Sequence, residues 1–109
     1  MARLPWFPVA VAGDSMEPTL RAGEWWLARR TRRVRVGDVV VVRQPEQGDL
    51  LTVKRVTRLE GAKCWVEGDN PPRSRDSRHY GPVDQEEIIA QLVVRYRPLP
   101  PRRIPRLGG

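Results

Sequence analysis

Three short stretches of the chain carry side chains that could do chemistry together. The first, residues 13–20, holds Ser15 between a flexible Gly-Asp entry and Pro18, which stops a helix from forming at once. This arrangement could hold a hydroxyl exposed and fixed at the mouth of a turn, although such an octet is by itself usually only a turn. A serine hydroxyl becomes a good nucleophile only when a base takes its proton.

Two side chains could supply that base. Histidine is the usual partner of a serine, but the only histidine, His79, lies in a polar, turn-rich stretch. A lysine can act instead when burial lowers the pKa of its amine, so that the amine is neutral at the working pH. Lys54 lies in an apolar strand pattern that could bury it, or it could face solvent on an edge strand beside Arg55.

Lysine is rare in this chain, which adds weight to Lys54. Of 20 basic residues, 18 are Arg and only Lys54 and Lys63 are Lys. A guanidinium is always charged, whereas a buried lysine amine can lose its proton. A lysine inside an apolar strand therefore indicates a task that Arg cannot perform.

The third stretch, residues 68–83, is dense in residues that hydrogen-bond locally. Its opening, Gly68-Asp69-Asn70, suits a turn with positive φ. Further on, Asp76 and Arg78 lie two residues apart and could pair across a loop. Each of these residues taken singly is ordinary for a loop.

Composition bounds the classes of protein that need to be considered. With 109 residues the chain forms one domain at most. A single cysteine excludes an internal disulfide and a cysteine-rich zinc site, and a single histidine argues against a His-based metal site or a Ser-His triad, so we expect no metal and no cofactor. One cysteine also favours a reducing compartment such as the cytoplasm. The net charge of +7 would attract nucleic acid, anionic lipid or an acidic partner, and it also suits a GC-rich genome.

The hydrophobic pattern predicts short strands separated by turn residues. Strands are expected at residues 9–12, 24–29, 39–43, 49–59, 64–67 and 89–96, with one helical turn at 84–88. Residues 1–8 are expected to be irregular, and residues 98–109, rich in Pro and Arg, to form a mobile tail. Strands at a spacing of about ten residues indicate a mainly β domain.

The three stretches, in this order, resemble the motifs of the type I signal peptidase family, the Ser-Lys proteases of peptidase family S26. Ser-Met-x-Pro-Thr-Leu at 15–20 resembles the nucleophile box, and Val-Lys-Arg-Val at 53–56 resembles the base box. Gly-Asp-Asn, Ser-x-Asp-Ser-Arg and Gly-Pro-Val between residues 68 and 83 resemble the third box. Each motif is moderately specific, and together they cover residues 9 to about 96.

This resemblance implies a fold and a role for several residues. The fold would be a small single-domain β-barrel or sandwich of the signal peptidase (LexA-like) catalytic core, mainly β with short helical turns, over residues 1–97. Ser15 would attack the scissile carbonyl, with Lys54 as general base and then general acid. Ser74 would orient the lysine amine, and Asp76 with Arg78 would brace the site.

The resemblance also implies an oxyanion site and a substrate groove. The backbone N–H of Ser15 would stabilise the oxyanion, while Gly13 stands where some members carry a second, side-chain donor. The substrate would lie extended between the strand before the nucleophile and the strand of the base. The side chains expected to contact it are Val9, Val11, Met16, Leu51 and Val53.

Among members of the family, the short form without a membrane span or second β-domain looks most like the nickel-type superoxide dismutase maturation protease. In that subgroup the Asp-Leu-Leu-x-Val-Lys-Arg and Gly-Asp-Asn-Pro stretches have close counterparts. The resemblance therefore implies a cytoplasmic serine endopeptidase that removes an N-terminal propeptide or signal peptide. Its partner would be a precursor protein, such as a nickel superoxide dismutase precursor, and no nucleic acid is expected.

Other functions stay open at this point. A general signal-peptidase-like enzyme could work peripherally at a membrane, with Trp6, Phe7, Trp25 and Trp26 touching the bilayer beside Arg residues, or the two central Trp could be partly core. A basic β-barrel could instead bind RNA or single-stranded DNA, with aromatic side chains as stacking platforms, but this leaves the three ordered motifs unexplained. A self-cleaving repressor shares the Ser-Lys pair, yet we find neither a DNA-binding domain nor an obvious internal cleavage site.

Overall fold

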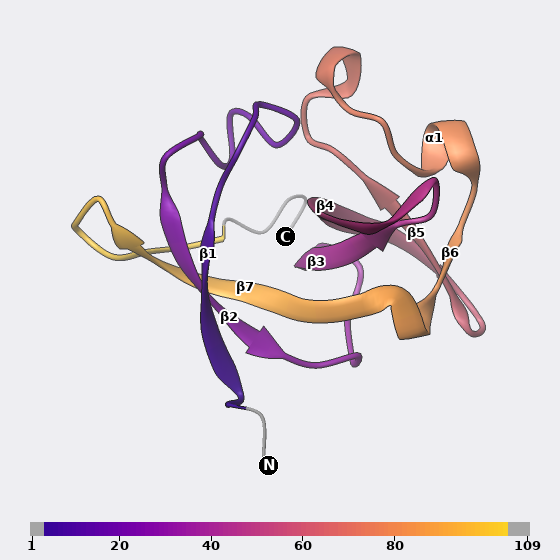
Figure 1. The fold of residues 1–109 in the computed structure, drawn as a ribbon, viewed down its shortest axis with the longest axis horizontal. Coiled ribbons are helices and arrows are strands. Elements are labelled where there is room, and N and C mark those ends of the chain that lie inside the picture. Colours follow the sequence, from indigo (N-terminus) through magenta and orange to yellow (C-terminus); the bar gives the residue numbers. More distant parts are fainter. Residues whose placement is uncertain (1–3, 105–109) are drawn as a thin grey trace.

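Antiparallel strands form the framework of the molecule. The computed structural model describes residues 4–104, and eight strands in this range form one sheet (Figure 1). They are β1 (Trp6–Ala10), β2 (Trp25–Arg30), β3 (Val39–Gln44), β4 (Gln47–Glu60), β5 (Lys63–Glu67), β6 (Val83–Asp84), β7 (Ile88–Arg97) and β8 (Arg102–Arg103). Three single helical turns complete it: η1 (Pro71–Arg73), α1 (Ser77–Tyr80) and η2 (Gln85–Glu87). The prediction of a small, mainly β single domain with short helical turns is confirmed.

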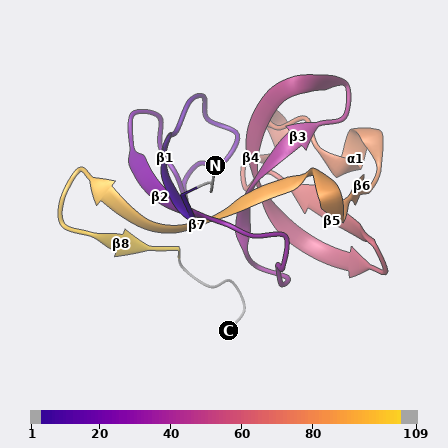
Figure 2. The ribbon, with the colours of Figure 1, turned by 60° about the horizontal axis from the view of Figure 1, so that its bottom comes forward.

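The long strand β7 joins the two halves of the sheet. The strand order is β1-β2-β7-β3-β4-β5-β6, with β8 paired to β7 off this path. The start of β7 pairs with β3, and nearly its whole length pairs with β2. Figure 2 shows β7 running from the half that holds β1 and β2 to the half that holds β3 to β6. Because β7 connects the two halves, the Ser15 turn and β4 lie in the same domain although they are distant in sequence.

Two apolar clusters form the core, and β3 contributes to both. Val39 and Val41 pack in the first cluster with Trp26 and Leu92, and Val40 and Val42 pack in the second, which includes Val56, Val66 and Ile88. Successive side chains of a strand point to opposite faces, so a central strand covered on both faces is a continuous apolar run. The four consecutive valines of β3 are therefore all buried.

Strand β4 changes partner halfway along its length. Residues 51–55 pair with β3, whereas residues 55–60 pair with β5 on the other edge. Within the described chain, the second edge of residues 51–54 therefore pairs with no strand. The outer strand β1 pairs only with β2 in the same range, so it too offers one free edge. The molecule thus has two free strand edges near its catalytic candidates.

The N-terminal part of the chain differs from the sequence prediction. Residues 6–8 were expected to be irregular, but β1 begins at Trp6, which pairs with Arg29. Pro8 misled the prediction, because proline is accepted on an outer strand whose free edge needs no N–H donor. The helical turn expected at 84–88 is confirmed as η2, whereas α1 and the short strands β6 and β8 were not predicted.

The C-terminal part is also more structured than expected over its described portion. Arg102 and Arg103 pair with β7 as β8, and Ile104 packs against the first core cluster. Residues 105–109 lie outside the described residues. The division into a catalytic domain over 1–97 and a mobile tail over 98–109 therefore stays a prediction. Between residues 4 and 104, no helix has the length and apolar character that crossing a membrane would need.

Candidate active site

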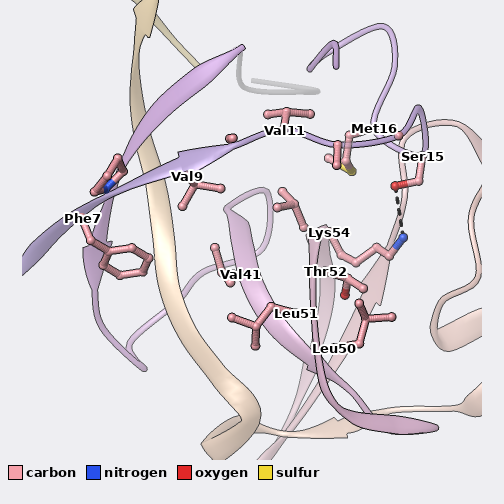
Figure 3. Close-up of a pocket in the computed structure, with 15 residues that line it drawn as sticks. Phe7, Val9, Val11, Ser15, Met16, Val41, Leu50, Leu51, Thr52 and Lys54 are labelled. Carbon is pink, nitrogen blue, oxygen red and sulfur yellow. Dashed lines mark hydrogen bonds between the residues drawn. The ribbon is translucent and has the colours of Figure 1, made fainter. Parts of the chain in front are cut away.

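Ser15 and Lys54 meet although 38 residues separate them in the chain. The Lys54 Nζ lies 3.2 Å from the Ser15 Oγ and 3.1 Å from the Ser74 Oγ. Ser15 is carried by the turn after β1, and Lys54 extends from β4 toward it (Figure 3). The structure thus brings all three predicted side chains within hydrogen-bond reach of one amine.

Burial lowers the pKa of the Lys54 amine. The residue is only 4% exposed, so it does not lie on a solvent face, and the neighbouring Arg55 is equally buried. Desolvation lowers the pKa of the Lys54 amine, because an ammonium loses its hydration in this position. The negative charge of Asp76 raises the pKa and the positive charge of Arg78 lowers it, and the net shift is downward.

Asp76 is the fully buried anion behind the pair. It accepts hydrogen bonds from the Ser74 hydroxyl at 2.6 Å, from the Gly68 N–H at 2.8 Å, and from the Arg78 guanidinium at 2.6 and 3.0 Å. Burial by itself raises the pKa of Asp76, but the bonds from Arg78, Ser74 and Gly68 outweigh it and hold the pKa well below its usual range. The carboxylate is therefore ionised at any working pH.

The Ser74 hydroxyl lies within hydrogen-bond reach of both the Lys54 amine and the Asp76 carboxylate. A hydroxyl has one hydrogen to donate, and Ser74 gives it to the ionised Asp76. Ser74 can then only accept from Lys54. This acceptor fixes the direction of one N–H bond of the Lys54 amine. Rotation about the Cε–Nζ bond is thereby fixed, and so are the directions of the other positions around Nζ.

The single histidine serves a helix cap. The Asp76 side chain accepts from the Arg78 N–H at 3.1 Å, and His79 Nδ1 accepts from the Asp76 N–H at 3.2 Å, which forms a capping box at the start of α1. The cap holds the Asp76 carboxylate in place beside Ser74. His79 thus contributes to the site by stabilising the helix cap that positions Asp76.

The Ser15 turn is held from the third stretch by backbone bonds. The Asn70 N–H donates to the Ser15 carbonyl at 2.9 Å, and the Asn70 side chain donates to the Asp14 carbonyl at 3.0 Å. Met16, only 3% exposed, anchors the turn in the first core cluster. Residues 68–70 were predicted to form a turn. The pairing of Asn70 with the Ser15 turn was not predicted, because its hydrogen-bond acceptors are backbone carbonyl oxygens, which every residue type carries.

A buried ion pair adds a second tie to the same turn. Arg55 donates to both carboxylate oxygens of Asp69 at 3.0 and 2.9 Å, and to the Gly37 carbonyl at 2.7 Å. Thr19 donates to Asp69 at 2.5 Å, which links the far end of the Ser15 turn to β4. The residue after Lys54 therefore helps to hold the strand and the turn together. Neither Arg55 nor Thr19 was predicted from the sequence to have such a task.

Gly68 lies where no side chain fits. A Cβ at this position would stand 2.2 Å from the Ser74 Oγ and 2.6 Å from the Ser15 carbonyl oxygen. The predicted positive φ at the Gly-Asp-Asn turn is wrong: in the described chain, positive φ occurs at five other glycines and at no other residue type. Gly68 is required for the close approach of two backbone segments.

A groove leads to the Ser15 and Lys54 pair. Its cavity of about 560 Å³ lies between β1 and β4 and ends at the pair (Figure 3). All five side chains predicted to contact substrate line it: Val9, Val11, Met16, Leu51 and Val53. Phe7 and Thr52 also line it and were not predicted. The groove is thus an apolar channel bounded by the two free strand edges.

Comparison with known proteins now identifies the family. Residues 4–93 match the family described as Peptidase S24-like. The chain belongs to the Peptidase S24-like family. Its sequence relatives include mitochondrial inner membrane protease subunit 1 of Xenopus tropicalis, 33% identical over 84% of this chain and 69% of the relative.

Two further relatives carry related names. Subunit 1a of the mitochondrial ATP-independent inner membrane protease of Arabidopsis thaliana is 33% identical over 81% of this chain and 68% of the relative. The human mitochondrial inner membrane protease subunit 1 is 30% identical over 84% and 69%. This S24-like chain is therefore a peptidase of the signal-peptidase-like kind. Its narrower assignment to nickel superoxide dismutase maturation stays a prediction.

Proposed function

We propose that the chain is a serine endopeptidase that uses Ser15 and Lys54 to remove an N-terminal propeptide or signal peptide from a precursor. The observation that carries this proposal is the buried lysine amine, with a lowered pKa, 3.2 Å from a serine hydroxyl at the end of an apolar groove. A neutral amine at this distance is a competent base for a serine nucleophile.

The first half of the reaction forms an ester on Ser15. The lone pair of the neutral Lys54 amine takes the Ser15 proton while the Ser15 oxygen attacks the scissile carbonyl carbon. The resulting oxyanion is stabilised by the Ser15 backbone N–H, which has no other hydrogen-bond acceptor within the described chain. When the intermediate collapses, the C–N bond breaks and the Lys54 ammonium protonates the leaving amine.

The second half releases the acyl product. A water molecule gives a proton to Lys54 and attacks the ester carbonyl, and the proton then returns to the Ser15 oxygen as the C–O bond breaks. Ser74 and Asp76 keep the amine oriented through both halves, and Arg78 keeps Asp76 ionised. Gly13 supplies no side-chain donor to the oxyanion, so the backbone N–H carries that task.

The substrate would bind as an added strand. Both β1 and residues 51–54 of β4 present free edges to the groove, and an extended peptide could pair with them. An extended, unfolded segment at the N-terminus of a precursor meets this requirement. A nickel superoxide dismutase precursor is our candidate, and precursors handled by a general processing enzyme at a membrane are the alternative.

Contact with a membrane surface would use exposed side chains of the N-terminal half. Leu4, Trp6 and Trp25 are exposed, so they could reach a bilayer beside Arg29 and Arg30. Of the two alternatives for the central tryptophans, bilayer contact or core, the core holds for Trp26, which is fully buried in the first core cluster. We place the enzyme in the cytoplasm with this optional peripheral contact.

The proposal is tested with the candidate precursor and one hydroxyl deletion. Mass spectrometry of the product would read the new N-terminus after incubation with the wild-type chain and with Ser15→Ala. We expect cleavage by the wild-type chain and none by Ser15→Ala, whereas Thr57→Ala, which removes a hydroxyl from β4 outside the site, should cleave normally. Retained cleavage by Ser15→Ala would remove the proposed nucleophile.

A further inference from the structure

A second cavity adjoins the substrate groove at the end away from Ser15. This second cavity, of about 780 Å³, shares the lining residues Phe7 and Leu51 with the groove. The groove itself is lined almost wholly by apolar residues along its length. The second cavity is different in kind, because arginines dominate its polar lining.

Four arginines and one glutamate line this second cavity. The arginines are Arg30, Arg32, Arg33 and Arg43, and the glutamate is Glu86. Two are partly engaged: Arg30 donates to the Leu4 carbonyl at 3.0 Å, and Arg43 lies 3.8 Å from Glu87. Over residues 4–104, the guanidiniums of Arg32 and Arg33 make no hydrogen bond or ion pair. The cavity therefore presents uncompensated positive charge.

The loop that carries Arg32 and Arg33 is fixed by its backbone. The Arg33 N–H donates to the Thr31 hydroxyl at 3.0 Å, and the Gln85 side chain donates to the Arg32 carbonyl at 2.8 Å. The Thr31 N–H donates to the Ile89 carbonyl at 3.3 Å. The two side chains are thus displayed on an anchored loop.

The position of this cavity along a bound peptide follows from strand geometry. Leu51 precedes Lys54 by three residues on β4, which is a distance of about 10 Å along a strand. A peptide with its scissile bond at Ser15 therefore reaches the arginines about four to seven residues away. The groove ends at Ser15, and the enzyme must hold the acyl half of its substrate after the amine has left. The peptide residues that reach the second cavity are therefore those N-terminal to the scissile bond.

We propose that this arginine-lined cavity selects precursors with acidic residues about four to seven positions N-terminal to the cleaved bond. The inference rests on the proposed function, since it takes the groove as the peptide site. Arg32 and Arg33 are its specificity-determining residues, and the substrate carboxylates supply the partners that the chain does not. Charge complementarity at a solvent-accessible site affects both the association rate of a peptide and the discrimination between peptides of different charge.

The test uses two peptides that differ only in charge. One carries Glu at the fifth and sixth positions N-terminal to the scissile bond, and the other carries Gln there. Exposed ion pairs are weak, so two of them predict kcat/KM about two- to thirtyfold higher for the Glu peptide. The double variant Arg32→Gln/Arg33→Gln should bring this ratio close to one, and added salt should lower it in the wild-type chain.

A matched control separates local from overall charge. Arg97 lies at the other end of β7, exposed and outside the cavity, so Arg97→Gln should keep the ratio of the wild-type chain. Equal kcat/KM for the two peptides in the wild-type chain, or an unchanged ratio in the double variant, would overturn the inference.

Binding measured without catalysis keeps this inference distinct from the proposed function. Fluorescence anisotropy of both labelled peptides on Ser15→Ala should show tighter binding of the Glu peptide, lost in the same chain with Arg32→Gln/Arg33→Gln. If the wild-type chain cleaves neither peptide while this difference in binding persists, the proposed function fails and the arginine-lined site for acidic residues stands. Equal binding of both peptides, together with an oligo-dT that binds through Arg32 and Arg33, would assign the cavity to nucleic acid and refute the proposal.

Discussion

Gly68→Ala places one methyl group between the two serines of the site. The added Cβ would stand 2.2 Å from the Ser74 Oγ, 2.5 Å from the Ser74 Cβ and 2.6 Å from the Ser15 carbonyl oxygen. Real Cβ atoms essentially never approach other atoms closer than 3.0 Å, so one segment must move by about 0.8 Å. Either movement separates Lys54 from one of its two serine partners.

The expected loss in activity is large because the displaced groups would be the reacting ones. A misplacement of about 1 Å at a reacting centre can cost roughly 100-fold in rate, so kcat/KM for Gly68→Ala should fall by about that factor. Overpacking costs about 1–3 kcal/mol, which corresponds to a fall in Tm of roughly 4–20 °C for a domain of this size. Peptide cleavage and thermal unfolding by circular dichroism measure the two effects.

Gly48→Ala is the matched control for this substitution. Gly48 lies on the same strand as Lys54, its φ is not positive, and a Cβ there would meet nothing within 4 Å. Its kcat/KM should equal that of the wild-type chain. If Gly68→Ala cleaves as fast as Gly48→Ala, the close packing of Ser15 against Ser74 has no bearing on catalysis, and the reasoning is refuted.

Three other substitutions probe the groups behind the amine. Ser74→Ala removes the hydrogen-bond acceptor of Lys54 and leaves Asp76 short of one donor. An unmade buried hydrogen bond costs about 1–3 kcal/mol, so kcat/KM should fall roughly 5- to 150-fold. An unchanged kcat/KM would show that Ser74 has no part in the site. Arg78→Gln removes a positive charge that lowers the Lys54 pKa and leaves the Asp76 charge, which raises it, less compensated. The Lys54 pKa should therefore rise, and the acid limb of the pH profile of kcat/KM should move to higher pH. A shift to lower pH would contradict the assigned charges. The folded pKa of Asp76 is depressed, so its stabilising contribution is complete above its unfolded pKa of about 4 and is lost as the pH falls below that. Asp76→Asn should therefore lower Tm at pH 7, and the gap to the wild-type chain should narrow in melts below about pH 3; a constant gap would show that the ionised carboxylate contributes no stability.

Much of the fold followed from side-chain periodicity. The valine run of β3 marked this strand because burial on two faces leaves a continuous apolar run in the sequence. The alternation around Leu51 and Val53 also marked β4 as a strand, but its burial does not alternate: Leu51 is exposed, whereas residues 54–56 are all buried. The start of β1 left no such pattern, since Pro8 argues against a strand until its position on a free edge is known. The pairing of β8 with β7 was equally invisible, because two arginines carry no apolar signal.

The candidate site was predictable to the extent that it consists of side chains. Ser15, Lys54, Asp76 and Arg78 were singled out by residue type, and Ser74 by the resemblance to a known family. The structure brings the five together, while their catalytic roles stay proposals. Backbone contacts were not predictable. The grip of Asn70 on the Ser15 carbonyl and the missing room at Gly68 depend on how two chain segments cross, and only the folded sheet determines that.

The central claim is that a neutral Lys54 amine takes the proton of Ser15, and replacing each of the chain's two lysines by arginine tests it directly. Lys54→Arg keeps a positive charge and loses the base, whereas Lys63→Arg makes the same change at an exposed residue paired with Asp84. We expect peptide cleavage to vanish in Lys54→Arg with the fold intact by circular dichroism, and to persist in Lys63→Arg. Cleavage by folded Lys54→Arg at the rate of Lys63→Arg would contradict the account.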